Sequence, residues 1–108
     1  MAKDTLGELE ELVMLAMVRL GDEAYGLAIV DELERTADRD VARASVYVLL
    51  RRLESAGLVE SRRESPQEAR GRPRRYVRPT PEGLALLRRV RSTRLRMWEG
   101  IEDALEGA

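Results

Sequence analysis

The segment ARASVYVLLRRLESAGLVESRR, from Ala42 to Arg63, decides the fold because its periodicity changes part-way along. Its first part repeats apolar residues at helical spacing, at Val46, Leu49, Leu50 and Leu53. The pattern predicts a helix over about 42–56, with Asp40 as its cap and Gly57 closing it. The residues after Gly57 alternate like a short strand, at Leu58, Val59, Ser61 and Arg63. A helix therefore passes directly into a strand.

Turning the apolar stripe of this helix inward leaves a small, hydroxylated and cationic face on the outside. We expect this face to contact DNA through Arg43, Ala44, Ser45, Tyr47, Val48, Arg51 and Arg52. Small residues let a helix approach a groove, arginine can pair with guanine, and hydroxyls can donate to phosphate oxygens. The alternative for Arg51 and Arg52 is a solvated helix face without a ligand.

Two more helices are predicted on the N-terminal side of this segment. Thr5 and Glu8 have capping-box spacing, and apolar residues then recur at helical period as far as Leu20. Gly21 ends this helix, and a turn separates it from a second helix over about 27–37. The strand is thus preceded by three helices.

A second strand is predicted on the C-terminal side, because Arg74, Tyr76 and Arg78 alternate again. The polar loop over 64–73 should form the flexible tip of the resulting hairpin. The hairpin is rich in arginine, with Arg62, Arg63, Arg70, Arg72, Arg74, Arg75 and Arg78. This density favours contact with the phosphate backbone or the minor groove, with Arg70, Arg72, Arg74 and Arg75 as the predicted contacts.

The last predicted helix begins at Thr80 and Pro81, a capping hydroxyl followed by proline at the first helical position, and runs to about Glu106. An apolar stripe, interrupted at Arg94, follows this helix: Leu87, Val90, Met97, Trp98, Ile101 and Leu105. A single helix cannot bury such a stripe. We therefore expect these residues to form the interface of a homodimer.

The charges are segregated along the chain although its net charge is only −1. Residues 1–40 carry 11 acidic and 4 basic side chains, residues 41–80 carry 4 and 10, and residues 81–108 carry 5 and 5. A basic middle segment is typical of a surface that neutralises phosphates. The chain has neither Cys nor His, which argues against disulfides, zinc sites and most catalytic sites, and no cofactor is expected.

Three helices followed by a two-stranded hairpin predict a winged helix-turn-helix, a mainly α fold with a small β-hairpin. We expect a DNA-binding domain over 1–79 and a C-terminal dimerisation helix over 80–108. A winged-helix protein-interaction adaptor or antirepressor, acting through the acidic N-terminal helices, is the main alternative. An enzyme is disfavoured because carboxylates such as Glu8 and Glu11 lie on exposed helix faces without a recognisable partner. The sequence shows no membrane span or signal peptide, so a soluble cytoplasmic protein is expected.

Several motifs resemble the PadR family of transcriptional regulators, in its short form with one C-terminal helix. They are LGELEELVMLAMV at Leu6 to Val18, Tyr25 with Gly26, SVYVLLRRLESAGLV at Ser45 to Val59, and GRPRRYVRPTPEG at Gly71 to Gly83. The resemblance implies a homodimeric repressor on a palindromic operator. It also makes Trp98 a candidate contact for a small hydrophobic effector, although a Trp within an apolar stripe is more often interface core.

Two positions depart from the family pattern. Pro79 replaces an apolar residue and lacks a backbone donor, so we expect the second strand to end early. Ala42 and Arg43 stand where the family often has Ser or Pro, which shifts the expected cap to Asp40.

Overall fold

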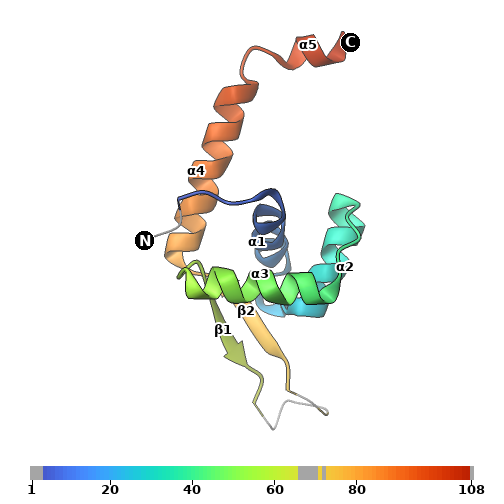
Figure 1. Cartoon of the computed structure of the whole chain (residues 1–108), viewed down its shortest axis with the longest axis vertical. Helices are drawn as coiled ribbons and strands as arrows, with labels where there is room; N and C mark the ends of the chain where they lie inside the picture. The colour runs from blue at the N-terminus through green and yellow to red at the C-terminus, as the bar shows by residue number, and fades with distance from the viewer. Residues whose placement is uncertain (1–3, 66–70, 72, 108) are drawn as a thin grey trace.

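The computed structural model describes residues 4–65, 71 and 73–107 and shows a winged helix-turn-helix (Figure 1). Its last two helices, over residues 81–106, form a C-terminal arm. The helical elements are α1 (Glu8–Leu20), a 3-10 turn η1 (Gly21–Glu23), α2 (Gly26–Ala37), α3 (Arg43–Ser55), α4 (Pro81–Trp98) and α5 (Glu102–Glu106). The strands β1 (Val59–Arg63) and β2 (Arg75–Pro79) form an antiparallel hairpin. The predicted mainly α fold with a small hairpin is confirmed.

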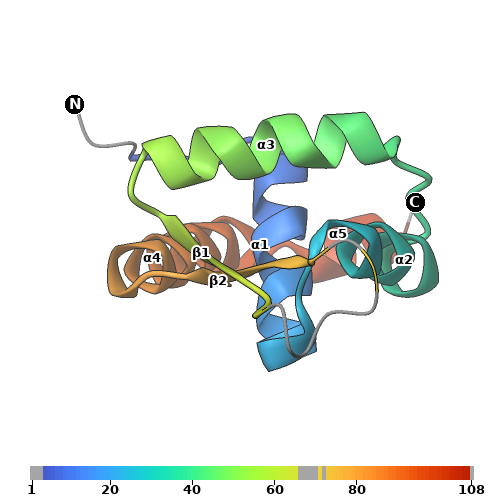
Figure 2. The ribbon, with the colours of Figure 1, turned by 90° about the horizontal axis from the view of Figure 1, so that it is seen from below.

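The core is built around α1 from buried residues of α2, α3, α4 and both strands, whereas η1 and α5 contribute none. Figure 2 shows α1 behind the hairpin, with α3 along one side. The four apolar residues predicted to face inward from α3 are all buried, as are Met14 and Met17 of α1 and Ile29 and Leu33 of α2. This packing turns the opposite face of α3 toward solvent.

The N-terminal helix begins three residues later than predicted. Gly7 is its N-cap, and the backbone N of Gly7 donates to Oε1 of Glu10 at 2.7 Å. The capping box predicted at Thr5 and Glu8 is therefore wrong. Gly21, with φ of 59°, ends the helix as expected.

The cap predicted for α3 is also wrong. Ala42 is the N-cap and makes no side-chain hydrogen bond, while Asp40 lies two residues outside the helix. The other end of α3 follows the prediction, because Gly57 has φ of 77° and Leu58 N donates to Leu53 O at 2.9 Å. This glycine turn sends the chain from α3 into β1.

Pro79 does not end β2 early, contrary to the prediction. It is the last residue of the strand and lies opposite Val59. Val77, two residues earlier, donates its N–H to Ala24 O at 2.9 Å and not to β1. Since residues two apart point the same way, the nitrogen of Pro79 also faces away from β1 and no ladder bond is lost.

The predicted C-terminal helix is two helices. Thr80 Oγ1 accepts from Gly83 N at 3.0 Å and caps α4, as predicted. The helix ends at Trp98, since Gly100 has φ of 82°, and a short α5 follows. Arg94, which interrupts the apolar stripe, pairs with Glu11 of α1 at 2.7 Å and ties the arm to the body.

Parts of the predicted hairpin tip, 66–70 and 72, lie outside the described residues. Within the described ranges, each helix is too short or too polar to cross a lipid bilayer.

Candidate nucleic-acid interface

The recognition face of α3, defined as Arg43, Ala44, Ser45, Tyr47, Val48, Arg51 and Arg52, is exposed at every position. It lies opposite the stripe that enters the core, as predicted. Within residues 4–65, 71 and 73–107, none of its three arginines has an ion-pair partner. Its positive charges are therefore not neutralised by that part of the chain and are available to an anionic ligand.

Tyr47 is held in place by Gly26, the first residue of α2. A Cβ atom on Gly26 would lie 2.3 Å from Cε1 of Tyr47 and 2.8 Å from its Cζ. Only glycine leaves room for the ring at this point, although the ring remains 42% exposed. The ring of Tyr47 is already fixed in the free protein, so contact with a duplex costs little side-chain entropy.

The hairpin, called the wing here (residues 59–79), turns one of its faces toward α3. On this face Arg75 Nη2 lies 3.2 Å from the carboxylate of Glu54, and its Nε donates to Ser61 Oγ at 3.0 Å. Ser61 in turn donates to Glu54 at 2.8 Å. The structure thus places Arg75, a predicted DNA contact, in an ion pair that joins the wing to α3.

The outer face of the wing carries arginines on tyrosine rings. The guanidinium carbon of Arg62 lies 4.6 Å from the ring centroid of Tyr76, and that of Arg74 lies 4.5 Å from the ring of Tyr25. The hydrogen bond to Tyr76 and the nearby Tyr25 raise the pKa of Arg74 above its usual value, so it stays charged. The DNA contacts expected from the sequence do not include Tyr25, Tyr76 or Arg62, although the strand register Arg62↔Tyr76 places two of them side by side.

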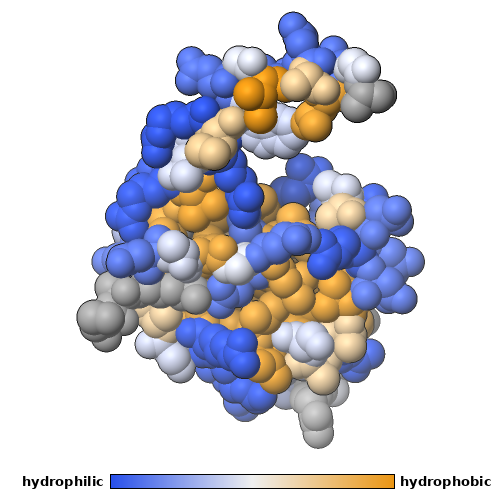
Figure 3. Space-filling model, turned by 45° about the horizontal axis from the view of Figure 1, so that its top comes forward, coloured by the Kyte–Doolittle hydropathy of each residue, from blue (hydrophilic) through white to orange (hydrophobic). Residues whose placement is uncertain are grey.

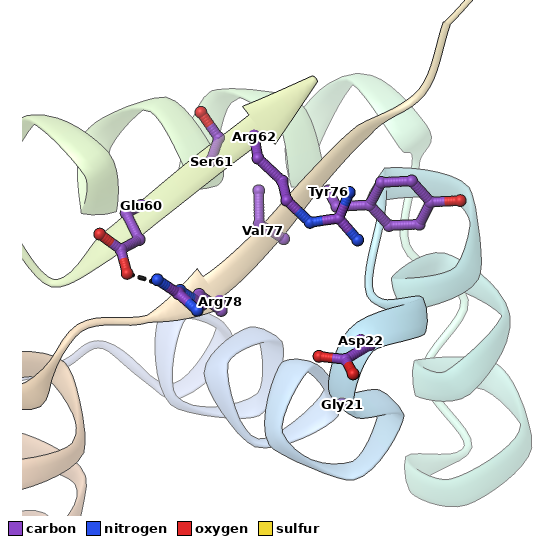
Figure 4. A pocket seen from close by; sticks show the side chains of 8 residues that line it. All are labelled: Gly21, Asp22, Glu60, Ser61, Arg62, Tyr76, Val77 and Arg78. Carbon is purple, nitrogen blue, oxygen red and sulfur yellow. Dashed lines mark hydrogen bonds and ion pairs between the residues drawn. The ribbon is translucent and has the colours of Figure 1, made fainter. Parts of the chain in front are cut away.

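Further along the outer face, Arg78 pairs with Glu60 at 2.6 Å, as Figure 4 shows. Arg63 is exposed and has no ion-pair partner in the described part of the chain. The predicted contacts Arg70 and Arg72 lie outside the described residues.

The predicted interface stripe of the C-terminal arm divides in two. Leu87 is buried in the core of its own chain and Val90 packs against that core. The other four are exposed, with Met97 at 73%, Trp98 at 47%, Ile101 at 48% and Leu105 at 58%. Sequence reasoning missed Leu95, which is 52% exposed. Figure 3 shows apolar surface on the arm and on the body below it, with a hollow between them.

The transcriptional regulator PadR-like family matches residues 14–89, which contain α3, the wing and the start of α4. The chain belongs to the PadR-like family. Among the solved structures, a PadR family transcriptional regulator from Eggerthella lenta DSM 2243 is 36% identical, with a TM-score of 0.70. The match covers 94% of this chain and 88% of that protein. Among curated proteins, none matches the sequence.

Two solved structures of lower sequence identity share the fold. A PadR-like regulator from Bacillus cereus strain ATCC 14579 has a TM-score of 0.74 at 23% identity, covering 93% of each chain. The Bordetella bronchiseptica regulator BpsR, whose DNA binding is regulated by 6-hydroxynicotinic acid, has a TM-score of 0.64 at 18% identity. That match covers 96% of this chain and 74% of BpsR.

The PadR-like fold makes this chain a DNA-binding transcriptional regulator, a class whose members are not enzymes. The exposed arginines of α3 lie where a winged helix-turn-helix presents its recognition helix to the major groove.

Proposed function

We propose that the chain is a homodimeric repressor that binds a palindromic operator through the recognition face and the wing of each subunit. The observation that carries this proposal is the exposed recognition face, whose arginines lack ion-pair partners among the described residues. A two-fold dimer presents two such faces to successive major grooves, about 34 Å apart. A palindromic operator matches that symmetry.

The recognition face contains groups for both base and phosphate contacts. Arg51 and Arg52 are long enough to reach the O6 and N7 atoms of guanine, and Arg43 lies at the start of the helix, where it can reach a phosphate. Ala44 and Ser45 keep the contact surface low, so the backbone of α3 can enter the groove. The wing, with Arg70, Arg72 and Arg74 among its arginines, binds the neighbouring backbone.

Residues 80–108 form the dimerisation unit beside the DNA-binding unit over 1–79. The exposed apolar side chains of the arm support this division, because a monomer would leave them in water. Leu87 and Val90 then fix the root of the arm to its own subunit, and Met97, Trp98, Ile101 and Leu105 meet the partner. Such a protein acts in the cytoplasm, where it reaches DNA.

Trp98 is the proposed contact for a small hydrophobic effector. Trp98 is about half exposed on the arm, among the apolar side chains proposed to meet the partner. The structural neighbour BpsR, whose DNA binding is regulated by 6-hydroxynicotinic acid, supports effector control on this fold. An effector of this kind would change the separation of the two recognition helices.

A fluorescence-anisotropy titration tests the proposal, with the DNA upstream of the protein's own gene, a random duplex as control, and two salt concentrations. Tight, salt-sensitive binding to the upstream DNA alone is expected, since counterions are released when arginines neutralise phosphates. Sedimentation equilibrium should give twice the chain mass. Failure to bind either duplex would favour the protein-interaction adaptor.

A further inference from the structure

The wing is fixed to the start of α2 as well as to α3. Val77 N donates to Ala24 O at 2.9 Å, and Tyr25 forms an isolated antiparallel bridge with Tyr76. The residues just before α2 therefore act as a short third strand beside β2. This contact restrains the angle between the wing and the helices.

Four side chains continue this contact outward as a row, called the Arg–Tyr row here: Arg62, Tyr76, Tyr25 and Arg74. The two tyrosine rings meet edge to face, with centroids 5.7 Å apart and planes at 77°. Each ring carries one guanidinium group at about 4.5 Å. Figure 4 shows Arg62 extended toward the ring of Tyr76, above the η1 turn. Arginine over an aromatic face is attracted by the negative face of the ring, so the rings hold both cations.

In the described part of the chain, no carboxylate forms an ion pair with Arg62 or Arg74. Glu60 is paired with Arg78, and Glu64 accepts from the backbone N of Arg74 at 3.2 Å. Asp22 lines the hollow of about 180 Å³ between the wing and η1, but it forms no ion pair with Arg62 in the described part of the chain. The row is therefore ordered by aromatic rings and keeps its positive charge for another ligand.

The row contributes little to the core beneath it. Tyr25 and Tyr76 are only partly buried, whereas their neighbours Ala24 and Val77 fill the core. Removing one ring leaves the backbone bonds and the buried apolar side chains in place.

We propose that Tyr25 and Tyr76 are positioning residues for DNA binding. They fix the angle of the wing and hold Arg62 and Arg74 so that the wing and the recognition face contact one duplex together. Two contacts held in a fixed geometry bind more tightly than two that must first be ordered. The inference rests on the proposed DNA binding and adds residues that do not themselves belong to the recognition face.

The test compares Tyr25→Leu, which removes the ring, with Tyr25→Phe, which keeps it. Each variant is titrated with the upstream duplex and with the same duplex shortened from both ends until wild-type affinity drops, which marks loss of the wing contact. For Tyr25→Leu we expect about a tenfold loss on the long duplex, the combined size of one aromatic pair and one cation–π contact. On the shortened duplex its loss should stay within about twofold, and Tyr25→Phe should match wild type on both.

A nuclear magnetic resonance spectrum of the free protein gives a readout that does not depend on DNA. The side-chain Nε–H signal of Arg74 should be shifted by the ring current of Tyr25, keep that shift in Tyr25→Phe and lose it in Tyr25→Leu. Equal losses of affinity on the long and shortened duplexes, or no loss on either, would overturn the inference while leaving the proposed function intact. Failure of the wild type to bind the upstream duplex would overturn the proposed function, and the inference with it.

Discussion

The arginines of the recognition face and those of the wing differ in what they contact within the chain. Arg43, Arg51 and Arg52 have no ion-pair partner among the described residues. The wing arginines are held instead: Arg75 and Arg78 by glutamates, and Arg62 and Arg74 by tyrosine rings. Unpaired cations on a helix suit base recognition. In the wing, the two glutamate pairs lower the free charge below what the composition indicates, whereas the tyrosine rings order Arg62 and Arg74 without neutralising them.

The strongest effect is expected at the junction on which both regions depend. A Cβ atom on Gly83 of α4 would lie 2.1 Å from the carbonyl oxygen of Leu58, where α3 passes into β1. Backbone cannot move aside as a side chain can, so Gly83→Ala should lower the free energy of unfolding by about 3 kcal/mol. Urea unfolding followed by circular dichroism measures this loss.

Gly7→Ala is the matched control for Gly83→Ala. Its Cβ would meet only the flexible end of Glu10 at 3.4 Å, so a loss below about 1 kcal/mol is expected. Similar losses for both variants would show that the close approach at Gly83 does not anchor the two regions.

The next effect distinguishes a base contact made by the recognition face from the non-specific attraction of any positive charge to DNA. Arg51→Ala should weaken operator binding about 30-fold and random-duplex binding less than about threefold, because a base contact is lost. Arg88→Ala, an exposed arginine on α4, removes the same charge elsewhere and should change both affinities less than about threefold. Equal losses on operator and random DNA for Arg51→Ala would contradict a base contact.

A smaller effect tests whether the ion pair with Glu54 keeps Arg75 of the wing from contributing to DNA binding. Arg75→Ala should weaken DNA binding less than about threefold, since Arg75 already pairs with Glu54. Glu54→Gln releases that charge and should strengthen random-duplex binding about twofold, measured by anisotropy at low salt. An Arg75→Ala loss as large as that of Arg51→Ala would erase the distinction between the two regions.

The smallest effect on DNA binding is expected at Glu32, which is remote from both regions. Hydrogen bonds from Thr36, Arg19 and Arg35 lower the pKa of this buried carboxylate to about 2. Because the folded pKa lies below the usual value of 4.5, Glu32 stabilises the fold above about pH 5 and progressively less as the pH falls toward 2. Melting temperatures at pH 6 and pH 3 should differ less for Glu32→Gln than for wild type, with operator affinity unchanged at pH 7. An unchanged pH dependence in Glu32→Gln would contradict this assignment.

Most helices and both strands could be predicted because their signals lie within a few residues. The inward stripe of α3, Gly57 after it, and Thr80 before α4 act through hydrogen bonds or packing between near neighbours. The errors arose where two local signals compete. Thr5 precedes Glu8 by three residues and Gly7 precedes Glu10 by three, so both could cap the helix; in the structure the N-cap is Gly7. Gly100 broke the last helix although the apolar spacing continued.

The sequence by itself determined the order of elements, the side of α3 that faces solvent and the basic character of the middle segment. Only the tertiary structure decided which of those charges are unpaired. Arg75 pairs with Glu54 and Arg78 with Glu60, whereas Arg62 and Arg74 lie on tyrosine rings that leave their charge in place. These partners lie far apart in the chain and come together only after strand register and helix packing are set. A helical or strand pattern depends on residues close together in the sequence, whereas the pairing of a charged side chain depends on residues that the fold brings near it.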